Sequence, residues 1–134
     1  MKTKQNEKRL VDANVILRFL LKDDLSLYKK AAETFERAER GEDSLVVESL
    51  VVGEVVWVLR ATYKISREKI SRSVTQLLSE KYVSCDDKVR LLNSLKYFGE
   101  SNLGFADCWL LAGVEKFGWG LESFDNKLKK SLIK

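Results

Sequence analysis

The chain has 134 residues, of which 45% are apolar and 33% charged, a composition typical of one globular domain that buries a full core. It contains no histidine, which excludes Ser-His-Asp and Cys-His catalysis and zinc sites of the HExxH type. A formal net charge of +4 weakly favours an anionic partner. No apolar run approaches the ~20 residues that span a membrane, and no signal-type apolar segment follows the charged start, so we expect a cytoplasmic protein without membrane contact.

Short apolar segments alternate with helical segments along the chain. The apolar runs that favour strands are residues 8–12, 44–49, 82–85 and 119–124. Helical spacing and turn signals predict helices over residues 15–24, 25–41, 50–60, 66–81, 86–101, 103–118 and 125–133. The alternation indicates an α/β fold, a three-layer α/β/α sandwich with a short-stranded parallel sheet. We expect one domain over residues 1–134, in which the charged residues 1–8 are either an extra arm or disordered.

One carboxylate interrupts the most apolar helical segment. In "LVVGEVVWVLR", residues 50–60, Glu54 has valine and leucine on every side of the helical wheel, so we expect it in or beside the core. A carboxylate taken out of water without a partner costs several kcal/mol. The sequence therefore predicts a partner for Glu54: a basic side chain, a hydrogen-bond network or a metal ion.

Three further acids stand at or near strand ends, where ligands bind in open parallel sheets. Asp12 ends the first predicted strand, Asp125 follows the last, and Asp107 lies early in the helix 103–118. Each also has a local explanation, because Asp12 and Asp125 are well placed as helix N-caps and Asp107 favours the helix dipole. Glu54 has no such role in mid-helix, and its alternative is a buried pair with Arg or Lys. Together the four acids indicate an oxygen-ligand site suited to Mg²⁺ or Mn²⁺.

Four stretches of the sequence resemble the motifs of PIN-domain ribonucleases, in order and over nearly the whole chain. They are "LVDANVILRFLLKDD", "VVGEVVWVL", "GFADCWLLA" and "SFDNKL", the last with a hydroxyl residue two positions before an acid. Position 13 is Ala, where Thr is common in the family. The size and the single-domain form are most similar to VapC-type toxins of toxin–antitoxin pairs.

The resemblance implies a PIN-like fold and a metal-dependent endoribonuclease. It implies that the four acids gather at one end of the sheet and hold one or two Mg²⁺ or Mn²⁺ ions; they are Asp12, Glu54, Asp107 and Asp125. Such an ion would polarise a phosphodiester oxygen and lower the pKa of a bound water. Asn14 would position a neighbouring acid or the phosphate, and Ser123 is the hydroxyl residue near the fourth acid.

The resemblance also implies partners. RNA is the family's substrate class, and the basic residues that would bind it are either part of that surface or plain solvated side chains: Arg18, Lys22, Lys127, Lys129 and Lys130. A small antitoxin is the implied protein partner, and a homodimer is expected. Apolar residues of the first two helices would form one of these interfaces or else belong to the monomer core: Phe19, Leu20, Leu25 and Leu27.

Two other functions remain open at this point. One is a catalytically silent PIN-like protein that acts as an RNA-binding or assembly scaffold, which the presence of all four acids disfavours. The other is an RNA-processing nuclease that has no antitoxin.

Overall fold

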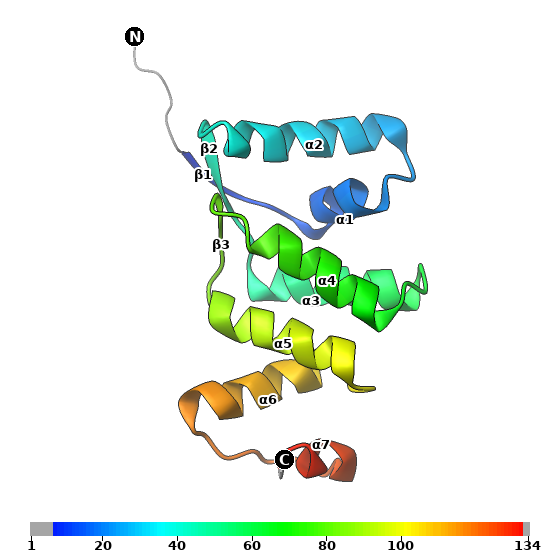
Figure 1. Ribbon diagram of the computed structural model, residues 1–134, viewed down its shortest axis with the longest axis vertical. Coiled ribbons are helices and arrows are strands. Elements are labelled where there is room, and N and C mark those ends of the chain that lie inside the picture. Colours follow the sequence, from blue (N-terminus) through cyan, green and yellow to red (C-terminus); the bar gives the residue numbers. More distant parts are fainter. Residues whose placement is uncertain (1–6, 133–134) are drawn as a thin grey trace.

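The computed structural model describes residues 7–132 of the chain, and within them the fold is a parallel sheet with helices packed around it (Figure 1). The strands are β1 (Glu7–Leu10), β2 (Asp43–Val46) and β3 (Val83–Ser84), hydrogen-bonded in the order β1-β2-β3. The predicted α/β sandwich with short parallel strands is therefore confirmed. Parallel strands carry their carboxyl ends at one edge of the sheet, and here each strand is followed by a helix that begins at that edge.

The first helices begin where the sequence offers side-chain caps. Helix α1 (Ala13–Leu21) is capped by Asp12, and α2 (Leu25–Glu39) by Asp24. Helix α3 (Ser49–Ala61) follows β2, and α4 (Arg67–Leu78) is capped by Ser66, as its sequence predicts. A cap supplies an acceptor for a backbone N–H that has no partner inside the helix.

The second half of the chain extends the molecule away from the sheet. Helix α5 (Lys88–Glu100) packs between α4 and α6 (Phe105–Phe117), and the short α7 (Asn126–Lys130) follows. Figure 1 shows α7 at the end of the molecule opposite α2. Among the described residues, no helix is long and apolar enough to cross a membrane.

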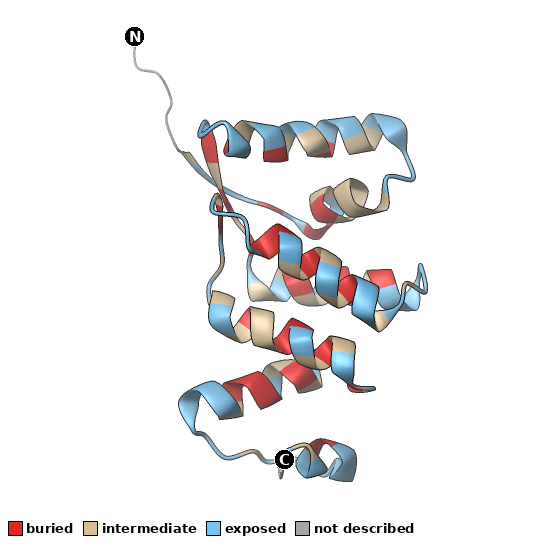
Figure 2. Ribbon diagram, in the orientation of Figure 1, coloured by how far each residue is buried: buried red, intermediate tan, exposed pale blue. Residues whose placement is uncertain are grey.

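The core lies between the sheet and the central helices, and its residues are red in Figure 2. The largest side chains that are almost wholly buried come from α1, β2, α4, α5 and α7: Ile16, Leu45, Ile70, Leu78, Leu91, Leu95 and Leu128. Burying such a side chain contributes about 1.5–3 kcal/mol. Leu128 matters for the C-terminal part because it anchors α7, whose other residues are exposed.

The predicted fourth strand, residues 119–124, does not form. Its first and last side chains, Trp119 and Phe124, are exposed. Among the described strands, β1 pairs with β2 alone, so no fourth strand lies beside it. The reason is the path of α6, which packs on α5, so the chain that leaves α6 runs toward α7 and away from β1 (Figure 1).

The predicted N-terminal arm over residues 1–8 is also corrected in part. Glu7 and Lys8 belong to β1 and pair in register with Asp43 and Ser44. Residues 1–6 lie outside the described residues.

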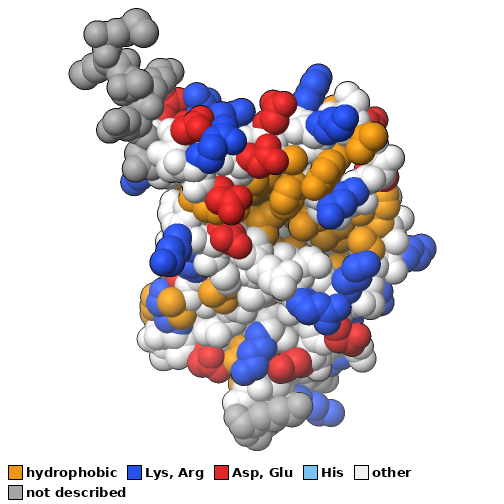
Figure 3. Space-filling model, turned by 45° about the horizontal axis from the view of Figure 1, so that its top comes forward, with side chains coloured by type: hydrophobic (Ala, Val, Ile, Leu, Met, Phe, Trp, Pro, Cys, Tyr) orange, Lys and Arg blue, Asp and Glu red, His pale blue; other side chains and the backbone are white. Residues whose placement is uncertain are grey.

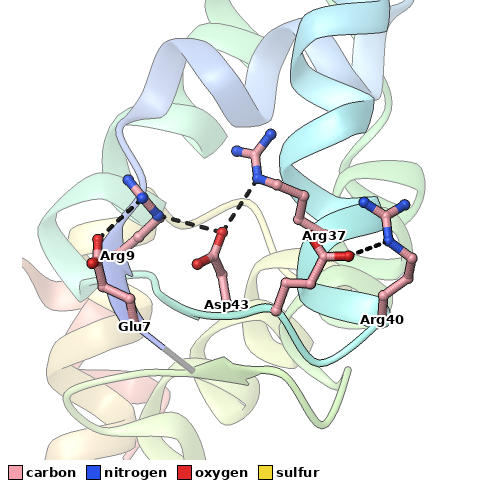
Figure 4. A network of polar contacts seen from close by, with 6 residues as sticks. Glu7, Arg9, Arg37, Arg40 and Asp43 are labelled. Atoms are coloured by element: carbon pink, nitrogen blue, oxygen red, sulfur yellow. Dashed lines mark hydrogen bonds and ion pairs between the residues drawn. The ribbon is translucent and has the colours of Figure 1, made fainter. Parts of the chain in front are cut away.

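A polar network joins β1, β2 and the end of α2. Asp43, which opens β2, is 7% exposed, and one of its oxygens lies 3.3 Å from Nε of Arg9 and 3.3 Å from Nε of Arg37. Figure 4 shows both arginines pointing at that oxygen. Arg9 and Arg37 thus compensate the charge of Asp43, the most deeply buried carboxylate among the described residues.

Candidate active site

Asp12 stands at the carboxyl end of the sheet, directly before α1. Its side chain is exposed, and one oxygen accepts a hydrogen bond of 3.0 Å from the backbone N–H of Val15. The predicted N-cap role of Asp12 is therefore confirmed. Its other carboxylate oxygen remains available to solvent or to a ligand. Asn14, in the first turn of α1, is exposed as well.

Glu54 is exposed, so the expectation that it lies in or beside the core is wrong. The buried face of α3 is formed by Val52, Val55, Val56 and Leu59. Glu54 lies on the opposite face together with the exposed Trp57, and no hydrogen bond or ion pair holds it among the described residues. Within the described part of the chain, the charge of Glu54 takes part in no contact that stabilises the fold, so folding alone does not explain a carboxylate at this position.

Asp107 lies in the first turn of α6, which begins at Phe105 after the N-cap residue Gly104. It is partly buried, and no described residue forms a hydrogen bond or ion pair with it. The residues just before it, Gly104 to Ala106, line a hollow that Glu54 also lines. Glu54 and the helical turn that carries Asp107 therefore border the same hollow.

Asp125 and Ser123 form a local turn before α7. Asp125 accepts hydrogen bonds from the N–H groups of Lys127 (2.9 Å) and Leu128 (3.2 Å), and its own N–H donates to Oγ of Ser123 at 3.0 Å. Asp125 is thus an N-cap. Figure 1 places α7, and with it this turn, far from α1, the helix that Asp12 caps.

The structure does not bring the four acids together as a metal site. Among the described residues, no group of three or more acidic, cysteine or histidine side chains is close enough to hold an ion. The donor chemistry suits Mg²⁺ or Mn²⁺, which take carboxylate oxygens, but the arrangement described here does not fit a bound ion. Asp125 is separated from the other three acids because residues 119–124 carry it away from the sheet.

Sequence reasoning missed two acids whose positions have clear structural reasons. Asp86, just beyond β3, accepts hydrogen bonds from the N–H (2.8 Å) and Oγ (2.7 Å) of Ser49, so it caps α3 from another part of the chain. Asp43 is the deeply buried carboxylate described above. No local pattern marks either residue, because Ser49 is 37 residues away from Asp86, and the partners of Asp43 lie on two other elements, Arg9 on β1 and Arg37 on α2.

The predicted basic residues lie in two groups. Arg18 and Lys22 belong to the end of α1, where Arg18 forms an ion pair with Asp23 at 3.3 Å and Lys22 lies over the ring of Tyr28. The three lysines of α7, at positions 127, 129 and 130, are exposed. A further cation that the sequence analysis did not name, Arg60 at the end of α3, lines the same hollow as Glu54.

The predicted apolar interface residues divide between surface and core. Phe19 stacks between Tyr28 and Phe35, with ring centroids 5.8 Å and 4.3 Å away, and packs with Leu20 against the core. Leu25 is exposed. Figure 3 shows a patch of hydrophobic side chains on one face, bordered by Lys and Arg on its right and by Asp and Glu on its left.

Neither cysteine is an activated nucleophile. Burial raises the pKa of the Cys108 thiol and that of the Cys85 thiol above their ordinary value. Because the thiolate is the reactive form, both remain protonated and unreactive at neutral pH.

Comparison with known proteins gives the class of this chain. Residues 9–131 match the PIN domain family, and the chain belongs to that family. It is also similar to a protein described as VapC ribonuclease from Aquifex aeolicus (strain VF5), with 27% identity over 125 residues, which are 91% of this chain and 90% of that protein. No solved structure matches the chain.

Proposed function

We propose that this protein is a metal-dependent endoribonuclease that hydrolyses RNA phosphodiester bonds with Mg²⁺ or Mn²⁺. The observation that carries the proposal is the match of residues 9–131 to the PIN domain family, with an acid at each of the four motif positions. The absence of histidine supports it further, since carboxylates are then the natural groups for phosphodiester chemistry. The proposed site residues are Asp12, Glu54, Asp107 and Asp125, with Asn14 and Ser123 as positioning residues.

The proposal requires the acids to come closer together than they are in the described arrangement. Asp12, Glu54 and Asp107 have exposed or partly exposed carboxylates, and repulsion between like charges opposes their approach without a cation. A divalent ion removes that repulsion. A substantial minority of proteins rearrange loops or domains when a partner binds.

We further propose that the protein is the toxin of a VapBC-type pair and forms a homodimer. The likeness to a VapC ribonuclease over most of both chains supports the first part. Exposed carboxylates are suitable targets for an Arg or Lys of a small antitoxin. An RNA-processing nuclease without an antitoxin has the same chemistry, and copurification with the product of a neighbouring gene separates the two.

The test is RNA cleavage by the purified protein with Mg²⁺ or Mn²⁺ and with EDTA. We expect cleavage of single-stranded RNA in the presence of either ion and none with EDTA. Glu54→Gln removes an exposed charge that has no partner among the described residues, so this variant should fold as the wild type does and lose cleavage. Intact RNA with folded wild type, over a panel of cellular RNAs, would contradict the proposal and favour the silent scaffold.

A further inference from the structure

A hollow of about 910 Å³ opens on the surface between α3, the end of α5 and the start of α6. Pockets of roughly 300–1,000 Å³ with aromatic walls and a few polar groups are typical sites for small organic ligands. Aromatic side chains from three helices line this one: Trp57 from α3, Phe98 from α5, and Phe105 and Trp109 from α6. Trp57 is 66% exposed, so most of its indole surface is free to contact a ligand.

The two arginines that line the hollow differ in how many contacts they form within the protein. Arg67 is engaged, since its guanidinium donates to the carbonyl oxygens of Phe98 and Leu103 and lies over the Phe98 ring. Arg60 is exposed and donates one hydrogen bond, 3.1 Å to the carbonyl oxygen of Ile65, and no carboxylate pairs with it in the described part of the chain. The hollow thus offers one aromatic surface and one available cation.

We infer that this hollow takes a splayed-out base of single-stranded RNA, with Trp57 as the stacking surface and Arg60 as the cation for a neighbouring phosphate. Proteins bind single-stranded RNA by stacking unpaired bases on aromatic rings beside basic side chains. Trp57 and Arg60 lie three residues apart on the same helix, and side chains at that spacing share a face. Both line one hollow.

The inference rests on the proposed function for its substrate. Glu54 lines the same hollow, so a base bound there would belong to a nucleotide close to the proposed cleavage site. Trp57 would then be a positioning residue, because it orders a nucleotide next to the phosphodiester bond that is cut. A docked protein side chain is the competing occupant, and Arg60, which no carboxylate pairs with among the described residues, favours a nucleotide with its phosphate.

The test is RNA binding measured by fluorescence anisotropy with 5′-labelled hexauridylate in EDTA, where no cleavage occurs. Trp57→Ala should weaken binding about 10-fold, and Trp57→Phe should stay within roughly 3-fold of wild type because a ring remains. Trp119→Ala is the matched control: Trp119 is 59% exposed, stacks on Phe117 outside the hollow, and its loss should leave binding unchanged. A 12-base-pair RNA duplex should bind equally to wild type and to Trp57→Ala.

Several results would overturn the inference. These are no binding of hexauridylate by wild type, equal binding by Trp57→Ala, and equal weakening by Trp119→Ala. If Trp57→Ala instead dissociates a dimer in sedimentation experiments and leaves RNA binding intact, the hollow is a protein interface.

Binding and cleavage also separate this inference from the proposed function. Trp57-dependent binding without any metal-dependent cleavage would uphold the base site and refute the nuclease. Normal binding and cleavage by Trp57→Ala would refute the base site and uphold the nuclease.

Discussion

Asp12→Asn is expected to reduce the proposed metal-dependent RNA cleavage roughly 100-fold, since Asp12 is a proposed ligand and the loss of a charged ligand weakens both ion binding and its chemistry. The same substitution should leave the fold intact. The cap of α1 is a 3.0 Å hydrogen bond from Val15 N–H to one side-chain oxygen, and an amide oxygen caps a helix about as well as a carboxylate. Asparagine therefore removes the charge and keeps the cap.

The chain contains a matched control for this variant. Asp24 is also exposed, caps α2, and accepts a hydrogen bond of 3.1 Å from Leu27 N–H. Asp24→Asn should change neither cleavage nor stability. Cleavage assays with circular dichroism melting on both variants compare them, and an Asp12→Asn protein that cleaves as fast as Asp24→Asn would remove Asp12 from the site.

The combined substitution Arg9→Ala and Arg37→Ala should lower the free energy of unfolding by about 3 kcal/mol, because it leaves a buried carboxylate unpaired. The side chain of Asp43 is 10% exposed, and those of its two arginine partners are 45% and 38% exposed. Each single variant leaves one arginine in place and should cost about 1 kcal/mol or less, as partly exposed ion pairs do.

A third substitution tests whether the charge is the cause. Adding Asp43→Asn to the double variant removes the buried negative charge, so urea unfolding should show that much of the lost stability returns. If the triple variant is as unstable as the double variant, the loss comes from arginine packing and not from the unpaired carboxylate.

Local signals in the sequence predicted most of the fold. Asp12 and Asp125 cap the helices that follow them through bonds to N–H groups two or three residues on, so these helix starts are visible in the sequence. The cap of α2 by Asp24 was not predicted, because residues 15–24 were assigned to one helix. The first three strands were predicted within one to three residues of their ends because their apolar runs are bounded by polar ones. The failures concern residues whose environment is set by distant parts of the chain.

Residues 119–124 have the composition of a strand, but a strand needs a neighbour, and the packing of α6 on α5 takes this segment away from the sheet. Valine and leucine surround Glu54 on the helical wheel, which predicts a position near the core. One face of α3 is not covered by other described elements, however, and Glu54 lies on that exposed face. The sequence was sufficient to identify each of the four motif acids individually. Their mutual distances depend on tertiary packing, which the sequence pattern does not encode.

The most direct test of the account is Mn²⁺ binding by isothermal titration calorimetry on wild type, Asp12→Asn and Asp24→Asn, without RNA, because it does not depend on the RNA target. The account predicts saturable binding by wild type and by Asp24→Asn, and at least about 10-fold weaker binding by Asp12→Asn. No saturable binding by wild type, or equal affinity in all three proteins, would contradict a metal site built on these acids.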